Sequence, residues 1–225
     1  MTHEKSPIDE VRRYYNEKIR AHGATPQGVD WRDAESQEAR FAQLALLIAK
    51  DLDASVADIG CGYGAFASFL RAQGWRGHYE GVDVSEEMID AAQKWLGRDS
   101  NFHLTFGATP SQPADFVVAS GIFNVKGETS GSEWVRYIYA TLDQMISLAK
   151  KGAAFNFLTS WSDAPFMRKD LFYAAPETIF AYCAERYSRW LEISQDYGLF
   201  EFTVRLRLDR RASRLRAEQL VSAKP

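Results

Sequence analysis

Cysteine is scarce in this sequence. Cys61 and Cys183 are the only two cysteines among 225 residues, and they lie far apart. Neither has a neighbour at the spacing of a metal site, and two distant cysteines do not make a disulfide framework. We therefore expect no metal site and a protein of the reducing cytoplasm.

Long apolar runs and an excess of one charge are missing as well. No stretch approaches the roughly 20 apolar residues that cross a bilayer, and residues 1–15 contain no apolar signal core. The formal net charge is −3 and the isoelectric point is near 5.9, so no strong field attracts nucleic acid or an anionic membrane. We expect a soluble protein that is not exported and does not bind a membrane.

The sequence instead contains 46% hydrophobic residues, which suits one compact domain, and a regular alternation of patterns. From Val56 onward, strand-like runs alternate with helical ones, which is typical of a mostly parallel sheet covered by helices. A tight link at Gly198 joins the last two strand-like runs and indicates an antiparallel hairpin. The expected strands are 55–60, 78–84, 101–106, 114–120, 153–160, 189–197 and 200–208.

Helical patterns fill most of the connections and also precede the first strand. The segment 107–113 is too rich in proline for a normal helix. The expected helices are 8–22, 33–51, 65–74, 85–97, 132–151 and 177–188.

The stretch "VADIGCGYGAF", residues 56–66, places three glycines directly after the first strand. Such a loop lets backbone N–H groups and a helix N-terminus face a ligand. Gly60, Gly62 and Ala65 satisfy a dinucleotide-binding fingerprint, and Asp83 ends the next strand, where an acid would bind ribose hydroxyls. The loop alone therefore leaves NAD open as a ligand.

Asp58 precedes these glycines at the end of the strand. A carboxylate there is badly placed beside a pyrophosphate and suits a ligand with an ammonium group. The segment 58–64, Asp-Ile-Gly-Cys-Gly-Tyr-Gly, matches the D/E-x-G-x-G-x-G motif of class I S-adenosylmethionine-dependent methyltransferases. The order of elements over residues 52–209 also resembles that family. The resemblance implies an α/β fold, a Rossmann-like seven-stranded mostly parallel sheet with a terminal antiparallel hairpin and two N-terminal helices.

The resemblance also implies a set of cofactor-binding residues for S-adenosylmethionine and its product, S-adenosylhomocysteine. Gly60, Gly62 and Gly64 would lie against the methionine part, and Asp83 would bind the ribose diol. The other expected cofactor-binding positions are Asp58, Val84, Met88, Ala108 and Ser120. Many relatives have an acid after the third strand, but here Gly107, Ala108 and Thr109 follow, so backbone groups or Thr109 would contact the adenine.

Methyl transfer from a sulfonium is an in-line displacement that requires alignment, exclusion of water and sometimes a base. Asn124, in the loop after the fourth strand, would orient a substrate hydroxyl or amine, or else cap a turn. Asp163 is our candidate for a general base or amine ligand, although it also suits a turn. The loop "SGIFN" lacks the Pro-Pro pair of amino-methylating DNA enzymes, and no Pro-Cys nucleophile is present. We therefore expect no DNA substrate.

The expected domain organisation has three parts: residues 1–51 as a helical lid, 52–209 as the cofactor-binding core and 210–225 as a basic tail. In the lid, Tyr14, Tyr15, Trp31 and Arg40 would line the site, and Arg40 would pair with the cofactor carboxylate. The alternative is that the lid aromatics, such as Trp31, pack these helices onto the sheet.

The sequence thus favours methyl transfer to an oxygen or nitrogen of a small polar metabolite or sugar-like substrate. One alternative is an NAD-dependent oxidoreductase, which needs a catalytic Tyr-x-x-x-Lys pair or its equivalent. No such pair follows the glycine loop. The other alternative is a cofactor-binding partner subunit without catalysis. The acceptor's identity and the choice between monomer and homodimer are left open.

Overall fold

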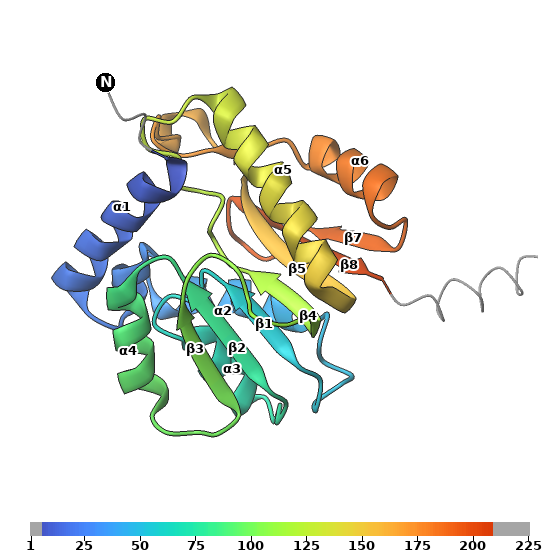
Figure 1. The fold of residues 1–225 in the computed structure, drawn as a ribbon. Coiled ribbons are helices and arrows are strands. Elements are labelled where there is room, and N and C mark those ends of the chain that lie inside the picture. The colour runs from blue at the N-terminus through green and yellow to red at the C-terminus, as the bar shows by residue number, and fades with distance from the viewer. Residues whose placement is uncertain (1–5, 209–225) are drawn as a thin grey trace, which may run out of the picture.

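Eight strands form one sheet in the computed structural model, which describes residues 6–208 (Figure 1). Seven of them follow the order β3-β2-β1-β4-β5-β8-β7, and the short β6 pairs with the end of β5. Only β8 runs antiparallel to its neighbours, β5 and β7. The bounds are β1 (Val56–Ile59), β2 (Tyr79–Asp83), β3 (Phe102–Phe106), β4 (Ala114–Ala119), β5 (Ala149–Thr159), β6 (Tyr173–Ala174), β7 (Leu191–Ser194) and β8 (Glu201–Arg207).

This arrangement confirms the predicted mostly parallel sheet with a reversed hairpin at its end. The hairpin places β8 between β5 and β7, so the last strand of the described chain lies inside the sheet. Two details differ from the prediction. β6 was not expected, and β5 begins at Ala149, four residues earlier than expected, where Lys151 binds Asp51 and Asp115 at the amino end of the sheet.

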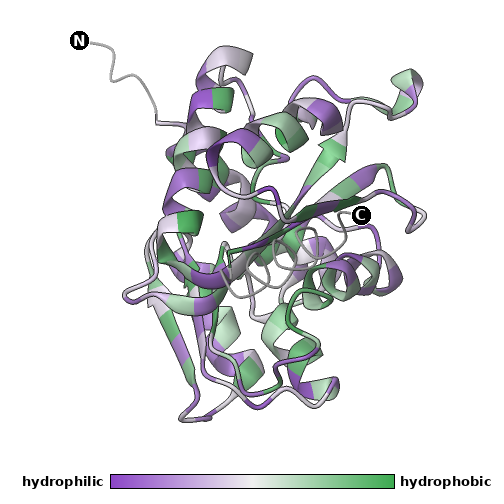
Figure 2. Ribbon diagram, turned by 90° about the vertical axis from the view of Figure 1, so that its right-hand side faces the viewer, coloured by the Kyte–Doolittle hydropathy of each residue, from purple (hydrophilic) through white to green (hydrophobic). Residues whose placement is uncertain are grey.

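Helices cover both faces of the sheet, because successive strand residues point to opposite sides. Ala57, Ile59 and Val117 pack in a core cluster with residues of α5 (Gly131–Leu148) and α6 (Pro176–Arg186). Val56 and Phe116 pack in a second cluster with residues of α2 (Ala34–Ala45) and α3 (Ala65–Ala72), while α4 (Glu86–Leu96) lies along β2 and β3. Figure 2 shows hydrophobic residues concentrated on the strands and many hydrophilic ones on the surrounding helices.

The two expected N-terminal helices are present as α1 (Pro7–His22) and α2, with the short helix η1 (Pro26–Val29) between them. Asp33 and Ser36 form a capping box that starts α2, which ends six residues before the predicted position, in a series of turns. In Figure 1, α1 lies beside α4. The predicted basic tail, 210–225, lies outside the described residues.

None of the helices in residues 6–208 combines the length and the apolar character needed to cross a membrane.

Replacing Phe157 with alanine should lower the free energy of unfolding by about 3–5 kcal/mol, the usual cost of removing a fully buried phenylalanine. Phe157 is fully buried and stacks on Phe123 with ring centroids 4.8 Å apart. The matched control is Phe180→Ala, because Phe180 lies on α6 and is 45% exposed. Urea denaturation followed by circular dichroism measures both variants. Equal losses would contradict this description of the core.

Candidate functional site

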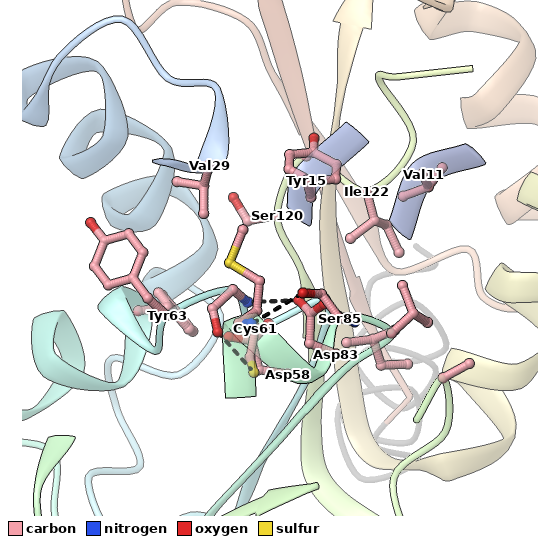
Figure 3. Close-up of a pocket in the computed structure, with 18 of the residues that line it drawn as sticks. Val11, Tyr15, Val29, Asp58, Cys61, Tyr63, Asp83, Ser85, Ser120 and Ile122 are labelled. Atoms are coloured by element: carbon pink, nitrogen blue, oxygen red, sulfur yellow. Dashed lines mark hydrogen bonds between the residues drawn. The ribbon is translucent and has the colours of Figure 1, made fainter. Parts of the chain in front are cut away.

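A cavity of about 140 Å³ opens at the carboxyl ends of β1, β2 and β4 (Figure 3). Its floor is the glycine loop after β1 together with the end of β2, where Asp58, Cys61 and Asp83 lie close together. The opposite wall comes from the N-terminal segment, including Val11 and Tyr15 of α1. The cavity is therefore built between the sheet edge and the helices that precede the sheet.

All three glycines of the motif have backbone conformations that side chains rarely adopt, and two of them line the cavity. Gly60 has φ 72° and Gly62 has φ 55°. A Cβ atom on Gly60 would lie 2.3 Å from Cγ2 of Ile122, and one on Gly62 would lie 3.0 Å from Cγ1 of Val29. The loop is thus closely packed against two other cavity walls, and a side chain at either glycine would push them apart.

The third glycine of the motif has a different role. Gly64 precedes the first residue of α3 and does not line the cavity. A Cβ atom there would lie 2.7 Å from Cδ1 of Leu96 on α4. The structure therefore supports Gly64 as a packing position and does not place it beside a ligand.

Asp83 holds the glycine loop against the end of β2. Its Oδ2 accepts a hydrogen bond from the backbone N–H of Gly62, and its Oδ1 accepts one from Ser85, each at 2.9 Å. Each carboxylate oxygen retains capacity for a further donor. Asp83 therefore fits a ligand that offers two adjacent hydroxyl groups.

Asp58 is a second buried carboxyl group on the cavity floor. Its Oδ2 accepts a hydrogen bond of 2.7 Å from the hydroxyl of Tyr79. Burial raises the pKa of Asp58 to about 7, and it raises the pKa of Asp83 to about 6 against the two backbone donors. Two carboxyl groups that lose solvation in one cavity favour a ligand with positive charge, which would restore their ionised form.

Val84, Met88 and Ala108, three of the predicted cofactor-binding positions, line the cavity. The neighbouring wall comes from α5, through Tyr137, Thr141 and Gln144, which the sequence reasoning missed. Their spacing of four and three residues places them on one helix face, a signal that was available in the sequence.

Thr109 does not line the cavity. Its hydroxyl instead accepts a hydrogen bond from the side chain of Gln144.

Ser120, at the end of β4, lines the cavity between the glycine loop and α1. Its Oγ is buried and has no hydrogen-bond partner within the described part of the chain. A buried hydroxyl without a partner costs free energy, so this group is available to a ligand.

The two predicted catalytic residues lie outside the cavity. Asn124 is buried, and its Oδ1 accepts a hydrogen bond of 3.3 Å from the backbone N–H of Leu158, so it ties its loop to β5. Asp163 is exposed and precedes the short helix η2 (Ala164–Phe166). The structure thus gives both residues the turn and loop roles that were the alternatives for them.

Tyr14 and Arg40 do not line the cavity either. The hydroxyl of Tyr14 donates to Oδ2 of Asp30 at 2.6 Å, while the adjacent Tyr15 faces the cavity, because neighbouring residues of a helix point in different directions. Arg40 is buried in an ion pair with Glu201. Its guanidinium is therefore engaged within the protein, which corrects its predicted pairing with a cofactor carboxylate.

Two tyrosine hydroxyls and one thiol that line the cavity stay protonated at neutral pH. Burial raises the pKa of Tyr15 and of Tyr137 above the usual range for phenols, so both stay protonated. Burial likewise raises the pKa of Cys61 well above its usual value, which makes this thiol a poor nucleophile. The arrangement is suited to aligning and enclosing reactants.

Comparison with known proteins identifies the family. Residues 31–199 match a family model described as a methyltransferase domain. The protein Rv1506c of Mycobacterium tuberculosis, whose name describes a methyltransferase, is 44% identical over 153 residues, which cover 68% of this chain and 92% of that protein.

Two solved structures share the fold. Magnesium protoporphyrin IX methyltransferase from Synechocystis PCC 6803, with bound S-adenosylmethionine, has a TM-score of 0.65 and 17% identity, covering 93% of this chain and 100% of that one. The N-methyltransferase NodS from Bradyrhizobium japonicum WM9, in complex with S-adenosylhomocysteine, has a TM-score of 0.64 and 17% identity, covering 89% and 99%.

Replacing Asp58 with asparagine should stabilise the protein at pH 8 more than at pH 5. A carboxyl whose pKa is raised to about 7 contributes stability below its unfolded pKa and loses it as the pH rises through 7. The asparagine variant escapes this loss, so its advantage in Tm should grow by several °C between pH 5 and pH 8, at about 1.4 kcal/mol per pKa unit.

The control for this experiment is Asp33→Asn. The backbone N–H of Ser36 lowers the pKa of Asp33 to about 2, so this carboxyl is ionised throughout the tested range. The Tm difference for Asp33→Asn should not change between pH 5 and pH 8. A pH-independent difference for Asp58→Asn would contradict its burial in the protonated form.

Proposed function

We propose, for a chain that belongs to the S-adenosylmethionine-dependent methyltransferases, that this cavity transfers the methyl group to an oxygen or nitrogen of a small polar metabolite or sugar-like acceptor. The family match covers most of the chain. The cavity offers groups that would bind the ribose hydroxyls and the positive charges of the donor. The acceptor class is the part that we infer.

The observation that carries the proposal is the pair of buried carboxyl groups beside a close-packed glycine loop. Asp83 would accept the ribose hydroxyls, while the backbone of Gly60 and Gly62, which lines the cavity, would contact the methionine part. Asp58 supplies negative charge beneath a ligand that carries a sulfonium and an ammonium group. The unpartnered Oγ of Ser120 is a further group that such a ligand would satisfy.

S-adenosylmethionine supplies an electrophilic methyl group, and the protein supplies alignment and exclusion of water. The hydroxyls of Tyr15 and Tyr137 would donate hydrogen bonds to a polar acceptor, while Val11 and Ile122 keep bulk water out. An acceptor amine would react in its neutral form, because only the neutral amine has a free lone pair to attack the methyl group.

Removing the Asp83 carboxylate should weaken S-adenosylhomocysteine binding at least tenfold, which corresponds to about 1.5–3 kcal/mol for charge-assisted hydrogen bonds. Calorimetric titration of Asp83→Ala and of the unaltered protein measures this. The control is Asp115→Asn, because Asp115 binds Ser55 and Lys151 at the amino end of the sheet and should not affect the affinity. Binding of NADH but not of S-adenosylhomocysteine by the unaltered protein would reject the proposal.

We also propose that α1 and η1 form a lid that closes over the donor. The α1 helix contributes Val11 and Tyr15 to the cavity, yet its polar contacts with the core are made by exposed side chains. The guanidinium of Arg20 binds the carboxylate of Glu87, and Oε2 of Glu10 accepts a hydrogen bond of 3.0 Å from the backbone of Glu128. Exposed pairs of this kind add little stability, so the helix can move.

S-adenosylhomocysteine should slow trypsin cleavage at Arg20 and Arg32, the two sites that flank the link between α1 and α2. Glu87→Gln should speed cleavage of the free protein, because it weakens the contact with Arg20. Glu86→Gln, at the exposed neighbouring position, should leave the rate unchanged. Gel analysis over time measures the rates. Equal rates with and without S-adenosylhomocysteine would reject the lid.

A further inference from the structure

A chain of hydrogen bonds connects a buried ion pair to the backbone of the cavity. Nη2 and Nε of Arg40 donate to Oε1 of Glu201 at 2.6 and 2.9 Å, and Nε also lies 2.8 Å from Oε2. The Nδ2 of Asn156 donates to Oε2 of Glu201 at 3.1 Å, and its Oδ1 accepts from the backbone N–H of Gly121 at 2.7 Å. Gly121 itself lines the cavity.

All three side chains that form this chain of hydrogen bonds are buried. Asn156 is fully buried, Glu201 is 1% exposed and Arg40 is 7% exposed. Nη1 of Arg40 donates to the backbone carbonyl of Ser36 on α2. The hydrogen bonds thus run from Arg40 on α2, through Glu201 on β8 and Asn156 on β5, to Gly121 in the loop after β4.

Trp31 lies against both ends of this chain of hydrogen bonds, Arg40 and Gly121. The guanidinium of Arg40 lies 3.9 Å from the centre of a Trp31 ring. A Cβ atom on Gly121 would lie 2.5 Å from Cη2 and from Cζ2 of Trp31. The indole therefore fills the space above Gly121, whose φ of 77° is also a conformation that favours glycine. Gly121 is held by a hydrogen bond on one side and by an aromatic ring on another.

The hydrogen bond to Asn156 fixes the orientation of one peptide plane. The N–H of Gly121 points toward β5, and the peptide bond is trans, so the carbonyl of Ser120 points the opposite way, toward the side of β1. The glycine loop follows β1 on that side. The peptide joining Ser120 to Gly121 is therefore oriented by a residue outside the cavity.

We propose that Arg40, Glu201 and Asn156 act as a positioning relay that fixes the Ser120–Gly121 peptide for donor binding, with Trp31 clamping it from above. The inference rests on the proposed use of this cavity for the methyl donor. Arg40 then contributes to the site through Glu201 and Asn156, without touching the ligand. A charged pair is costly to bury, and here Arg40 ties it to α2 through Ser36 while Glu201 connects it through Asn156 to the cavity.

Arg205 offers a matched comparison on the same strand. It is also buried, and it joins β8 to α2 through Gln43 and to β7 through Glu192 and Ser194. None of the hydrogen bonds described for it leads to Asn156 or to Gly121. Loss of Arg205 therefore tests the stability of this region without disturbing the relay.

The first test replaces Asn156 with leucine and Arg205 with methionine, with S-adenosylhomocysteine as the probe. Asn156→Leu should lower the affinity about tenfold, the effect expected for one lost buried hydrogen bond, while Arg205→Met should keep it within about twofold. Hydrogen exchange of the backbone amides in 119–125 should accelerate only in Asn156→Leu. Thermal unfolding records the stability of both. Unchanged affinity in Asn156→Leu, or an equal loss in Arg205→Met, would overturn the relay.

A second variant keeps the test decisive if the leucine variant does not fold. In Asn156→Asp, the introduced carboxyl can accept from Gly121 and donate to Glu201 only while it is protonated, because two carboxylates at this distance repel each other. The affinity of Asn156→Asp relative to the unaltered protein should fall as the pH rises from 6 to 9. A ratio that does not change with pH would also overturn the relay.

These measurements distinguish failure of the proposed function from failure of the relay. If the unaltered protein does not bind S-adenosylhomocysteine, the proposed function is rejected. If the unaltered protein binds and the relay variants bind equally well, only the relay is rejected.

Discussion

Two buried carboxyl groups, with no cationic partner among residues 6–208, determine what the carboxyl edge of this sheet can bind. Asp58 and Asp83 lie at the ends of adjacent parallel strands, and the pairing of those strands brings them into one cavity. Burial penalises their ionised forms, and the protein compensates only in part, with the Tyr79 hydroxyl and two backbone N–H groups. The glycine loop, the ends of the strands and the covering helices surround these two buried carboxyl groups. A cationic ligand would remove the penalty, so stability given up in the free protein becomes affinity for the donor.

The parts of the structure that depend on local patterns could be predicted from the sequence. Alternating hydrophobic runs predicted the sheet, and the spacing from the glycine loop to the end of the next strand predicted that Gly60, Gly62 and Asp83 meet. Val84 and Met88, which the family resemblance implied, lie shortly after Asp83 and also line the cavity. In each case, residues about 20 to 30 positions apart are joined by one strand–helix–strand unit.

The parts that depend on distant partners could not be predicted in this way. Arg40 was assigned to a cofactor carboxylate as part of the expected lid, but its partner Glu201 lies 161 residues later. Asn124 and Asp163 were chosen for their chemistry and their place after strands. The loop after β4 does line the cavity, but the side chain of Asn124 bonds to β5 instead, and Asp163 is exposed. Tyr14 and Tyr15 were both predicted to line the lid, and only the packing of α1 decides that Tyr15 faces the cavity and Tyr14 does not.

The ion pair between Arg40 and Glu201 cannot form during synthesis until the ribosome has released β8. Glu201 belongs to the last strand of the described chain, so a ribosome that has released the glycine loop, Asp58 and Asp83 has not yet released the partner of Arg40. The nascent chain then contains the residues of the donor site while the guanidinium and the Gly121 amide await their partners. Contacts between such distant residues form late in folding. The cavity would therefore become able to hold its ligand only after β8 has entered the sheet.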